Sequence, residues 1–594
     1  MVAVAQPPDR FRLGREGGLF ATADADVLAV LLHAFDQTPE SLERVAAVVR
    51  EEHPASVIFA PPLPIGTFSS ADPVEIAAGL VRRIDDQVEA RQTQPDGGSY
   101  RSIILIGHSA GAVMARKIWA LAHGATPSAG IDPARRRPWA RKIDRIVLLA
   151  AMNRGWMISS ALDPLARLLW TFGTAWGHFS RFVLRREPFI FGLRRGAPFL
   201  TTTRLQCLTV ADALRHDLPI TVQLLGTADD YVAPTDNVDL ATGQEFHYLE
   251  VTEATHRGIV FLDEGDGADS ALQQFRTALS ADRPALSAAS LKKEDVFDLF
   301  EESVDDHDAT TSARRNSAVE HVVFVVHGIR DRGFWTRRIA RLVKKLARDR
   351  GQHCRSVTST YGYFPMGPFL APWSRRAKVE WLLDQYVTAK ALYPDADFAY
   401  VGHSNGTYLL AKALQLCPAV RFRRVVFAGS VVQRRYDWTS LLQRPDGTWQ
   451  VGAIVNYVAT ADWVVAVFPQ GLERMRLQDL GGAGHAGFMI GDDARLTNVE
   501  HVVGGHGAAL TRKNWEEMAE FVLGGDAPPG NRGTQPSATV ARLGRWAPFL
   551  WAAIIVVVVG IGVLLLLPLG YPGWLLAVGF ALYLSLLRVV ATKA

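Results

Sequence analysis

Two serines in this sequence stand between glycines in the same pattern. Residues 107–111 read GHSAG around Ser109, and residues 402–406 read GHSNG around Ser404. Each pattern follows an apolar run and opens a helix-like run, and glycines on such a sharp turn avoid clashes in a tightly bent backbone. A serine hydroxyl is a poor nucleophile until a base accepts its proton. The sequence therefore predicts two nucleophile elbows, each with a general base nearby.

The segments around both serines alternate short apolar runs with helix-length amphipathic runs. This rhythm predicts an α/β fold with a mostly parallel sheet covered by helices. His33 lies 76 positions before Ser109, and His327 lies 77 positions before Ser404. The repeated pattern and spacing indicate an internal duplication in which each half is a domain.

These motifs resemble the α/β-hydrolase superfamily, and within it the serine esterases and lipases. The resemblance covers roughly residues 26–279 and 321–523 and implies a triad in the order Ser, then Asp or Glu, then His in each half. In the first half it implicates Ser109, Asp229 and His256, with Asp230 as the alternative acid because it also follows the apolar run ending at Gly226.

In the second half the resemblance implicates Ser404, Asp462 and His506. Asp462 ends an apolar run, and His506 lies in a glycine-rich loop ahead of a terminal helix. Asp479 and His485, in the loop LQDLGGAGHAGF, remain alternatives for the acid and the base.

The resemblance also implies two backbone N–H donors for the oxyanion in each half. One belongs to the residue after the serine, which is Ala110 or Asn405, and the other to the loop after an early strand. The second donor is expected from Ala34 or Phe35 in the first half, and from Gly328 or Ile329 in the second. His33 and His327 are expected to hold these loops rather than to transfer protons.

No HExxH motif, phosphate loop or dinucleotide fingerprint occurs, so no cofactor and no metal are expected. The net charge of +4 gives no electrostatic case for nucleic acid. The three cysteines are widely spaced, which suits a reducing compartment better than a disulfide framework.

The C-terminal region contains an uncharged apolar run at 549–567, long enough to cross a bilayer, and a shorter one at 574–587 that spans only if it continues past Arg588. Basic residues flank both runs and the turn between them is uncharged, which predicts a transmembrane hairpin with both ends, and the catalytic domains, in the cytoplasm. The expected segments are domain 1–280, linker 281–319, domain 320–523, linker 524–545 and hairpin 546–594.

The two halves differ in length between serine and acid. Ser109 and Asp229 are 120 positions apart, whereas Ser404 and Asp462 are 58 apart, so the first half contains an insert at about 152–200. The insert is rich in aromatic and basic residues. It is read either as a lid or membrane-facing surface or as ordinary packing helices with solvated arginines.

The favoured interpretation is a membrane-anchored serine hydrolase that cleaves hydrophobic or lipidic carboxylic esters through an acyl-enzyme. Two alternatives stay open, namely an acyltransferase that uses the same serine and a scaffold protein in which one or both domains are inactive. Substrate identity and oligomeric state are not fixed by the sequence.

Overall fold

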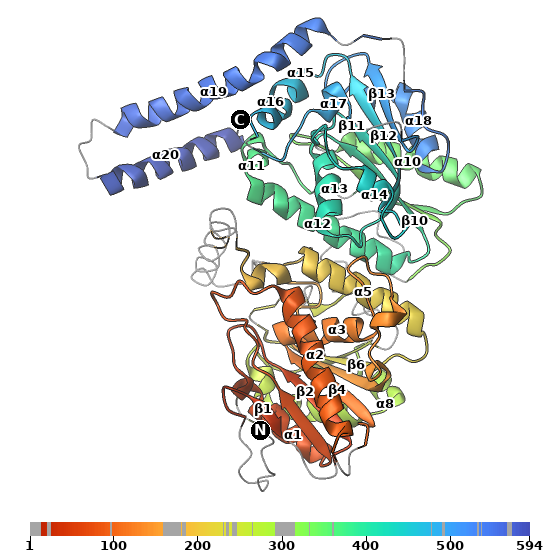
Figure 1. Ribbon diagram of the computed structural model, residues 1–594, viewed down its shortest axis with the longest axis vertical. Coiled ribbons are helices and arrows are strands. Elements are labelled where there is room, and N and C mark those ends of the chain that lie inside the picture. The colour runs from red at the N-terminus through yellow and green to blue at the C-terminus, as the bar shows by residue number, and fades with distance from the viewer. Residues whose placement is uncertain are drawn as a thin grey trace. The chain divides into compact units, whose positions relative to one another are not determined.

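The computed structural model divides into two compact units, Met1–Ala313 and Arg314–Ala594 (Figure 1). The residues that the structure describes are 13–20, 25–94, 98–157, 177, 180, 186–229, 231–232, 237–239, 246–263, 265, 267–291, 315–331, 333–358, 361–476, 478–489, 493–530, 534–535, 537–566 and 573–593.

The first unit is built on a seven-stranded sheet with the order β1-β3-β2-β4-β5-β6-β7. Its strands are β1 Gly18–Phe20, β2 Val27–Leu32, β3 Ser56–Ala60, β4 Ser102–His108, β5 Ile143–Leu149, β6 Ile220–Gly226 and β7 Phe246–Val251. All neighbouring pairs are parallel except β1 with β3.

Both faces of this sheet are buried, because alternate side chains of its apolar strands point to opposite sides. In β2, Leu28, Val30 and Leu32 join one core, while Val27, Ala29 and Leu31 join the other. Helices α2 Pro73–Gln92, α3 Ala110–Ala122 and α5 Pro198–Leu214 cover the first face, and α1 Glu43–Glu52 and α7 Ala268–Ser280 cover the second.

The second unit contains a six-stranded, fully parallel sheet with the order β13-β12-β11-β10-β8-β9. Its strands are β8 His321–Val326, β9 Cys354–Val357, β10 Asp397–His403, β11 Phe422–Ala428, β12 Val451–Ala459 and β13 Leu496–Val502. Apart from β1, the two sheets have the same order when they are read from β3 and from β9. The predicted α/β class with mostly parallel sheets is confirmed.

The helices of the second unit alternate with its strands. They are α10 Phe334–Asp349, α11 Met366–Leu370, α12 Pro372–Leu392, α13 Asn405–Leu416, α14 Thr439–Leu442, α15 Trp463–Val467, α16 Pro469–Arg474, α17 Ala483–Ala486 and α18 Arg512–Val522. One face of the sheet packs against α10 and α18. On α12, Tyr386 packs against a cluster of aromatic rings that includes Phe324 and Phe422.

Parts of the two expected linkers, 281–319 and 524–545, contain regular structure or buried side chains. Helix α8, Arg283–Ala289, lies inside the segment 281–319, and its Leu286 is fully buried. At the other end of that segment Val319 is buried as well. The segment 524–545 is also structured at its end, since helix α19 begins at Ala538. Buried apolar side chains therefore lie at both ends of the segment 281–319, and its role as a linker remains a prediction.

The expected insert at 152–200 is described only at its ends, and residues 158–176 lie outside the described part. Phe189 and Phe191 are buried in the core of the first unit. Trp156 donates from Nε1 to the Ile190 carbonyl over 2.8 Å, and the Arg194 guanidinium lies over its ring. The described aromatic residues of the insert therefore pack as core.

Two helices end the chain, α19 Ala538–Leu566 and α20 Gly573–Lys593. Among the described residues, α19 is the one helix long and apolar enough to cross a membrane, while the apolar stretch of α20, Leu575–Leu584, is shorter. The helices are antiparallel, since a side chain on Gly562 would touch Phe580 and the Tyr583 hydroxyl donates to the Val558 carbonyl. A second span remains a prediction.

Candidate active sites

Both elbow serines have a backbone conformation that side chains rarely adopt. Ser109 joins β4 to α3 with φ 53° and ψ −112°, and Ser404 joins β10 to α13 with φ 51° and ψ −118°. A non-glycine residue in such a backbone conformation costs about 1–3 kcal/mol of stability, and the conformation persists only where the surrounding structure enforces it. Each serine is therefore held by its strand and helix at the carboxyl edge of the sheet.

The flanking glycines leave room for this turn. A Cβ on Gly107 would lie 2.5 Å from the Ala112 backbone, and one on Gly111 would lie 2.1 Å from the Leu32 carbonyl oxygen. In the second elbow a Cβ on Gly406 would lie 2.5 Å from the Val326 carbonyl oxygen. These contacts press each elbow against the neighbouring strand, β2 or β8.

The first site forms a continuous chain of hydrogen bonds. His256 Nε2 lies 2.9 Å from Ser109 Oγ, and His256 Nδ1 lies 2.9 Å from Asp229 Oδ2. The other oxygen of Asp229 accepts the N–H groups of Tyr231 and Val232, at 3.0 and 2.8 Å. These bonds fix the carboxylate behind the imidazole, in the arrangement that lets His256 take the serine proton. The alternative acid Asp230 lies outside the described residues.

The second site contains the same acid and base but a different contact at the serine. His506 Nδ1 lies 2.9 Å from Asp462 Oδ2, and Asp462 Oδ1 accepts the Val465 N–H at the start of α15 over 3.0 Å. In the described part of the chain, no hydrogen bond joins Ser404 Oγ to His506. The acid and base are paired, whereas the serine is not yet engaged.

The alternative acid Asp479 has other partners. Its carboxylate pairs with Arg375 and Lys412 and accepts the Tyr408 hydroxyl, at 3.0, 3.1 and 2.9 Å. His485 lies on α17, and the histidine that pairs with Asp462 is His506. Within the described residues no group of three His, Cys, Asp or Glu side chains could hold a metal ion.

The histidines that precede the serines contact the loops that carry His256 and His506. His108 Nε2 lies 2.8 Å from the carbonyl oxygen of His256, and His403 Nε2 lies 3.3 Å from that of His506. Burial, together with a smaller contribution from the neighbouring histidine, lowers the pKa of both imidazoles to about 3. Each ring is therefore neutral and donates from Nε2. No role was predicted for His108 and His403, although both precede the serine of a GHS motif.

The expected oxyanion loop of the first unit is held by His33. Its Nε2 accepts the Leu63 N–H and its Nδ1 donates to the Ala34 carbonyl, both over 2.9 Å. The loop follows β2, which pairs with β4, so it lies beside the elbow. Ala110 is the first residue of α3 and its N–H has no acceptor within the helix. Within the described part of the chain, the Phe35 N–H donates to no acceptor.

In the second unit a histidine and a tyrosine hold the corresponding loop, and His327 Nδ1 donates to the Gly328 carbonyl over 2.7 Å. The Tyr361 hydroxyl lies 2.9 Å from the His327 carbonyl oxygen and 3.0 Å from that of Gly328, and it accepts from Asn405 Nδ2 over 3.1 Å. The Tyr361 ring stacks on His327 at 4.4 Å. Because N–H and C=O point opposite ways in a peptide unit, these bonds set the directions of the N–H groups of Gly328 and Ile329.

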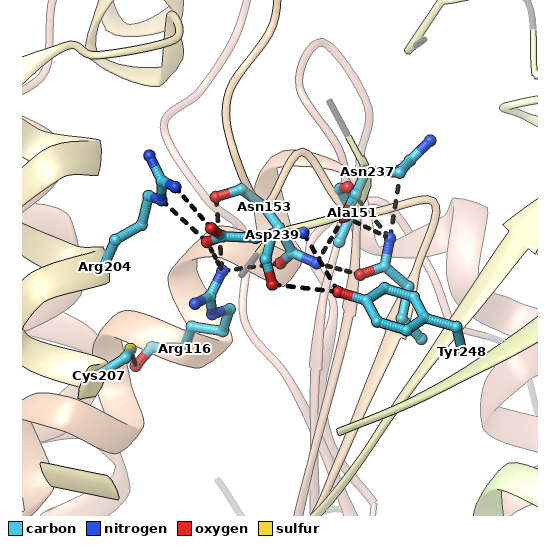
Figure 2. Close-up of polar contacts among 9 residues, drawn as sticks. Arg116, Ala151, Asn153, Arg204, Cys207, Asn237, Asp239 and Tyr248 are labelled. Atoms are coloured by element: carbon cyan, nitrogen blue, oxygen red, sulfur yellow. Dashed lines mark hydrogen bonds and ion pairs between the residues drawn. The ribbon is translucent and has the colours of Figure 1, made fainter. Parts of the chain in front are cut away.

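A buried ion-pair network supports the segment between β6 and β7, which carries Asp229 (Figure 2). Asp239 lies in the segment after Asp229. Its carboxylate accepts a hydrogen bond from Arg204 Nε over 2.9 Å and lies 3.5 Å from the Arg116 guanidinium. Arg116 also donates to Asn153 over 2.9 Å. The network thereby joins α3, α5 and the ends of the loops after β5 and β6. Spacing in the sequence offered no signal for it.

Comparisons with known proteins return lipases and esterases among solved structures. They include a carboxyl esterase from Tuber melanosporum (15% identity, 44% of this chain, 82% of that chain, TM-score 0.29) and a monoglyceride lipase from Saccharomyces cerevisiae (11%, 46%, 89%, 0.28). A third is the phospholipase PlaB from Legionella pneumophila (13%, 47%, 63%, 0.31). At such TM-scores these likenesses carry no conclusion about this chain. No family model and no curated protein matches.

Replacing Gly111 by Ala should destabilise the first unit by about 1–3 kcal/mol or more, because the new Cβ would overlap the Leu32 carbonyl oxygen. Urea unfolding in detergent measures this. Gly98→Ala is the matched control, since nothing lies within 4 Å of a Cβ there. Equal stability of the two variants would contradict the proposed packing of elbow on β2.

Asp239→Asn should destabilise the first unit by about 3–5 kcal/mol, because it removes a carboxylate from two buried guanidinium groups. Thermal unfolding is the measurement, and Asp217→Asn, at an exposed position, is the control. A change in the melting temperature no larger than that of the control would refute a supporting role.

The free energy of unfolding should decrease as the pH is lowered below 6.5, because of the two buried histidines. An unfolded histidine binds a proton near pH 6.5, whereas His108 and His403 have pKa values of about 3 in the folded chain. Their contribution is complete above pH 6.5 and decreases by about 1.4 kcal/mol per histidine for each pH unit below it. Between pH 6.5 and 4.5, His108→Gln should remove the pH dependence of the free energy of unfolding that one histidine contributes. The control His216→Gln, at an exposed position, should leave this dependence unchanged.

Proposed function

We propose that this chain is a membrane-anchored tandem serine hydrolase that cleaves hydrophobic carboxylic esters, with each unit an α/β-hydrolase domain. The observation that carries the proposal is the chain of hydrogen bonds from Ser109 through His256 to Asp229, built on an elbow with positive φ. A serine, a base and an orienting acid in this geometry are the components of acyl transfer through a covalent intermediate.

In the first site, Ser109 Oγ attacks the ester carbonyl while His256 accepts its proton, and Asp229 stabilises the imidazolium that forms. The N–H groups of Ala110 and of Ala34 or Phe35 are the proposed donors to the oxyanion. His256 then protonates the departing alcohol. Water, deprotonated by the same imidazole, attacks the acyl-enzyme and releases the acid.

In the second site, Ser404, Asp462 and His506 are proposed for the same roles, with Asn405 and either Gly328 or Ile329 as oxyanion donors. The bond between Ser404 and His506 has to form when substrate binds. Hydrogen bonds in unoccupied sites are often longer than in the complex. We therefore propose that the second serine reacts more slowly than the first in the absence of substrate.

The proposed membrane anchor rests on α19, whose apolar run passes the length and composition test for a span. Arg542 and Arg545 precede this run, and Arg588 and Lys593 lie near the end of α20. Basic flanks favour the cytoplasmic side, so both catalytic units are proposed to face the cytoplasm. An anchor of this kind keeps the enzyme beside hydrophobic esters, which partition into bilayers.

Labelling with a fluorescent fluorophosphonate tests this function, because the probe reacts only with an activated serine. Wild type should carry two labels, while Ser109→Ala and Ser404→Ala should each carry one. His256→Ala should abolish labelling at Ser109 alone, and His506→Ala labelling at Ser404 alone. The rate at Ser109 should exceed that at Ser404 by about tenfold or more, corresponding to about 1.4 kcal/mol.

The labelling experiment also has clear negative outcomes. No labelling at either serine in folded protein would favour the scaffold interpretation over an enzyme. Retained labelling at Ser404 in His506→Ala would transfer the role of the base elsewhere, and His485 would be the next candidate.

A further inference from the structure

The helix proposed as the membrane anchor is docked on the helices that follow the second acid. Asp462 caps the N-terminus of α15. Trp551 of α19 donates from Nε1 to the carbonyl of Val467, the last residue of α15, over 3.3 Å. Its ring meets Phe468 edge-on, with centroids 5.7 Å apart. The acid and the anchor are thus connected through one short helix.

Close backbone contacts make this docking tight. A Cβ on Gly471 of α16 would lie 2.9 Å from the Trp551 ring and 3.0 Å from Ala547 Cβ. On α19, a Cβ on Gly544 would lie 3.2 Å from a backbone oxygen of α15, and Arg474 donates to the Gly544 carbonyl over 2.5 Å. Small residues at a helix crossing allow the backbones to approach closely, as they do here.

The docked part of α19 runs directly into its apolar part. The apolar run begins at Phe549, two residues before Trp551, which is about 3 Å along a helix. The helix is unbroken from Ala538 to Leu566. If the span begins at Phe549, no flexible segment separates α15 from the lipid headgroups.

The returning helix contacts the second unit near its other catalytic loop. Helix α20 runs antiparallel to α19 and lies against α11 (Figure 1). Helix α11 begins five residues after Tyr361, which holds the expected oxyanion loop. The two apolar helices therefore contact the acid side and the oxyanion side of the same site.

Exposed apolar side chains gather at the same edge of this unit. Because parallel strands end on one edge, residues that follow them lie near Ser404, which follows β10. The exposed side chains that follow strands β8, β9, β12 and β13 are Phe334, Tyr363, Trp373, Trp463 and Val503. Aromatic side chains at one edge are typical of a surface that enters the headgroup region.

We propose that the second site takes its acyl-lipid substrate directly from the bilayer, with the carboxyl edge of the second sheet resting on the membrane surface. This inference rests on the proposed function of that site. Helix α19 sets the height of the unit above the lipid, and α15 places Asp462 at that height. The occupant of the exposed apolar edge is a phospholipid or acylglycerol surface.

Depth measurement tests the surface without any need for activity. An environment-sensitive fluorophore is attached to Phe334→Cys or to Arg348→Cys in full-length protein in which Cys354 is replaced by Ser. Both positions lie on α10, about 21 Å apart along the helix. In phosphatidylcholine vesicles with brominated acyl chains, the label at 334 should be quenched at least threefold more than the label at 348. Equal quenching would overturn the proposal.

Activity then tests the source of the substrate. In the Ser109→Ala background, which isolates the second site, Phe334→Ser should lower kcat/KM on a long-chain diacylglycerol in vesicles at least tenfold. The value for a short, soluble ester should stay within twofold. Phe68→Ser, at an aromatic residue of the first unit that is even more exposed than Phe334, is the control and should change neither value.

The outcomes separate the two proposals. Unchanged hydrolysis of the vesicle substrate by both Phe334→Ser and Val503→Ser would overturn uptake from the bilayer. Equal losses on both substrates for Phe334→Ser indicate a local folding defect, and Val503→Ser, on the loop after β13, then decides. No hydrolysis of either ester in the Ser109→Ala background would refute the enzyme function of the second site, while the depth measurement would still test its surface.

Discussion

In each unit, the packing around the site depends on the strained backbone conformation of the elbow serine. A residue with φ near 50° between a strand and a helix brings the first turn of that helix against the neighbouring strand. Only glycine fits where the two backbones meet, as the distance from Gly111 to the Leu32 carbonyl shows. A sheet buried on both faces supplies the rigidity that this strain requires.

The strand order then decides which loops can meet the serine. In both sheets the strand that carries the elbow pairs with the strand that carries the expected oxyanion loop, β4 with β2 and β10 with β8. Chain connections reverse direction across the sheet at this point, where α/β proteins commonly bind their ligands. In both units the histidine after the strand donates to the next carbonyl, His33 to Ala34 and His327 to Gly328, and in the second unit the Tyr361 hydroxyl bonds to the same loop as well.

The sequence predicted what depends on local pattern and missed what depends on tertiary contact. The glycines of the elbow are readable because the turn demands them within five residues. Asp229 and Asp462 were predicted as the acids because Asp229 follows an apolar run and Asp462 ends one. Tyr361 could not be found this way, since its hydroxyl acts on carbonyls more than 30 positions earlier in the chain. Asp239 was missed for the same reason, because its partners come from two distant helices.

Composition reports polarity rather than packing, so it gave no sign of the structured parts of the two expected linkers. Arg283–Ala289 lies within the stretch that was predicted to be a linker, yet its buried Leu286 belongs to a core of the first unit. Likewise the segment 524–545 was predicted to be a linker, yet α19 begins within it at Ala538. The glycine at 544 was the only local sign of a close helix contact.

The docking of α19 has a kinetic consequence for the proposed hydrolysis of lipids at the second site. A catalytic unit mounted without slack on a bilayer searches in two dimensions, by lateral diffusion. Its supply of substrate is then set by the mole fraction of that lipid in the surface and not by its amount per volume of solution. Diluting the substrate with inert lipid would slow such a unit, whereas diluting the whole suspension with buffer would leave its turnover unchanged.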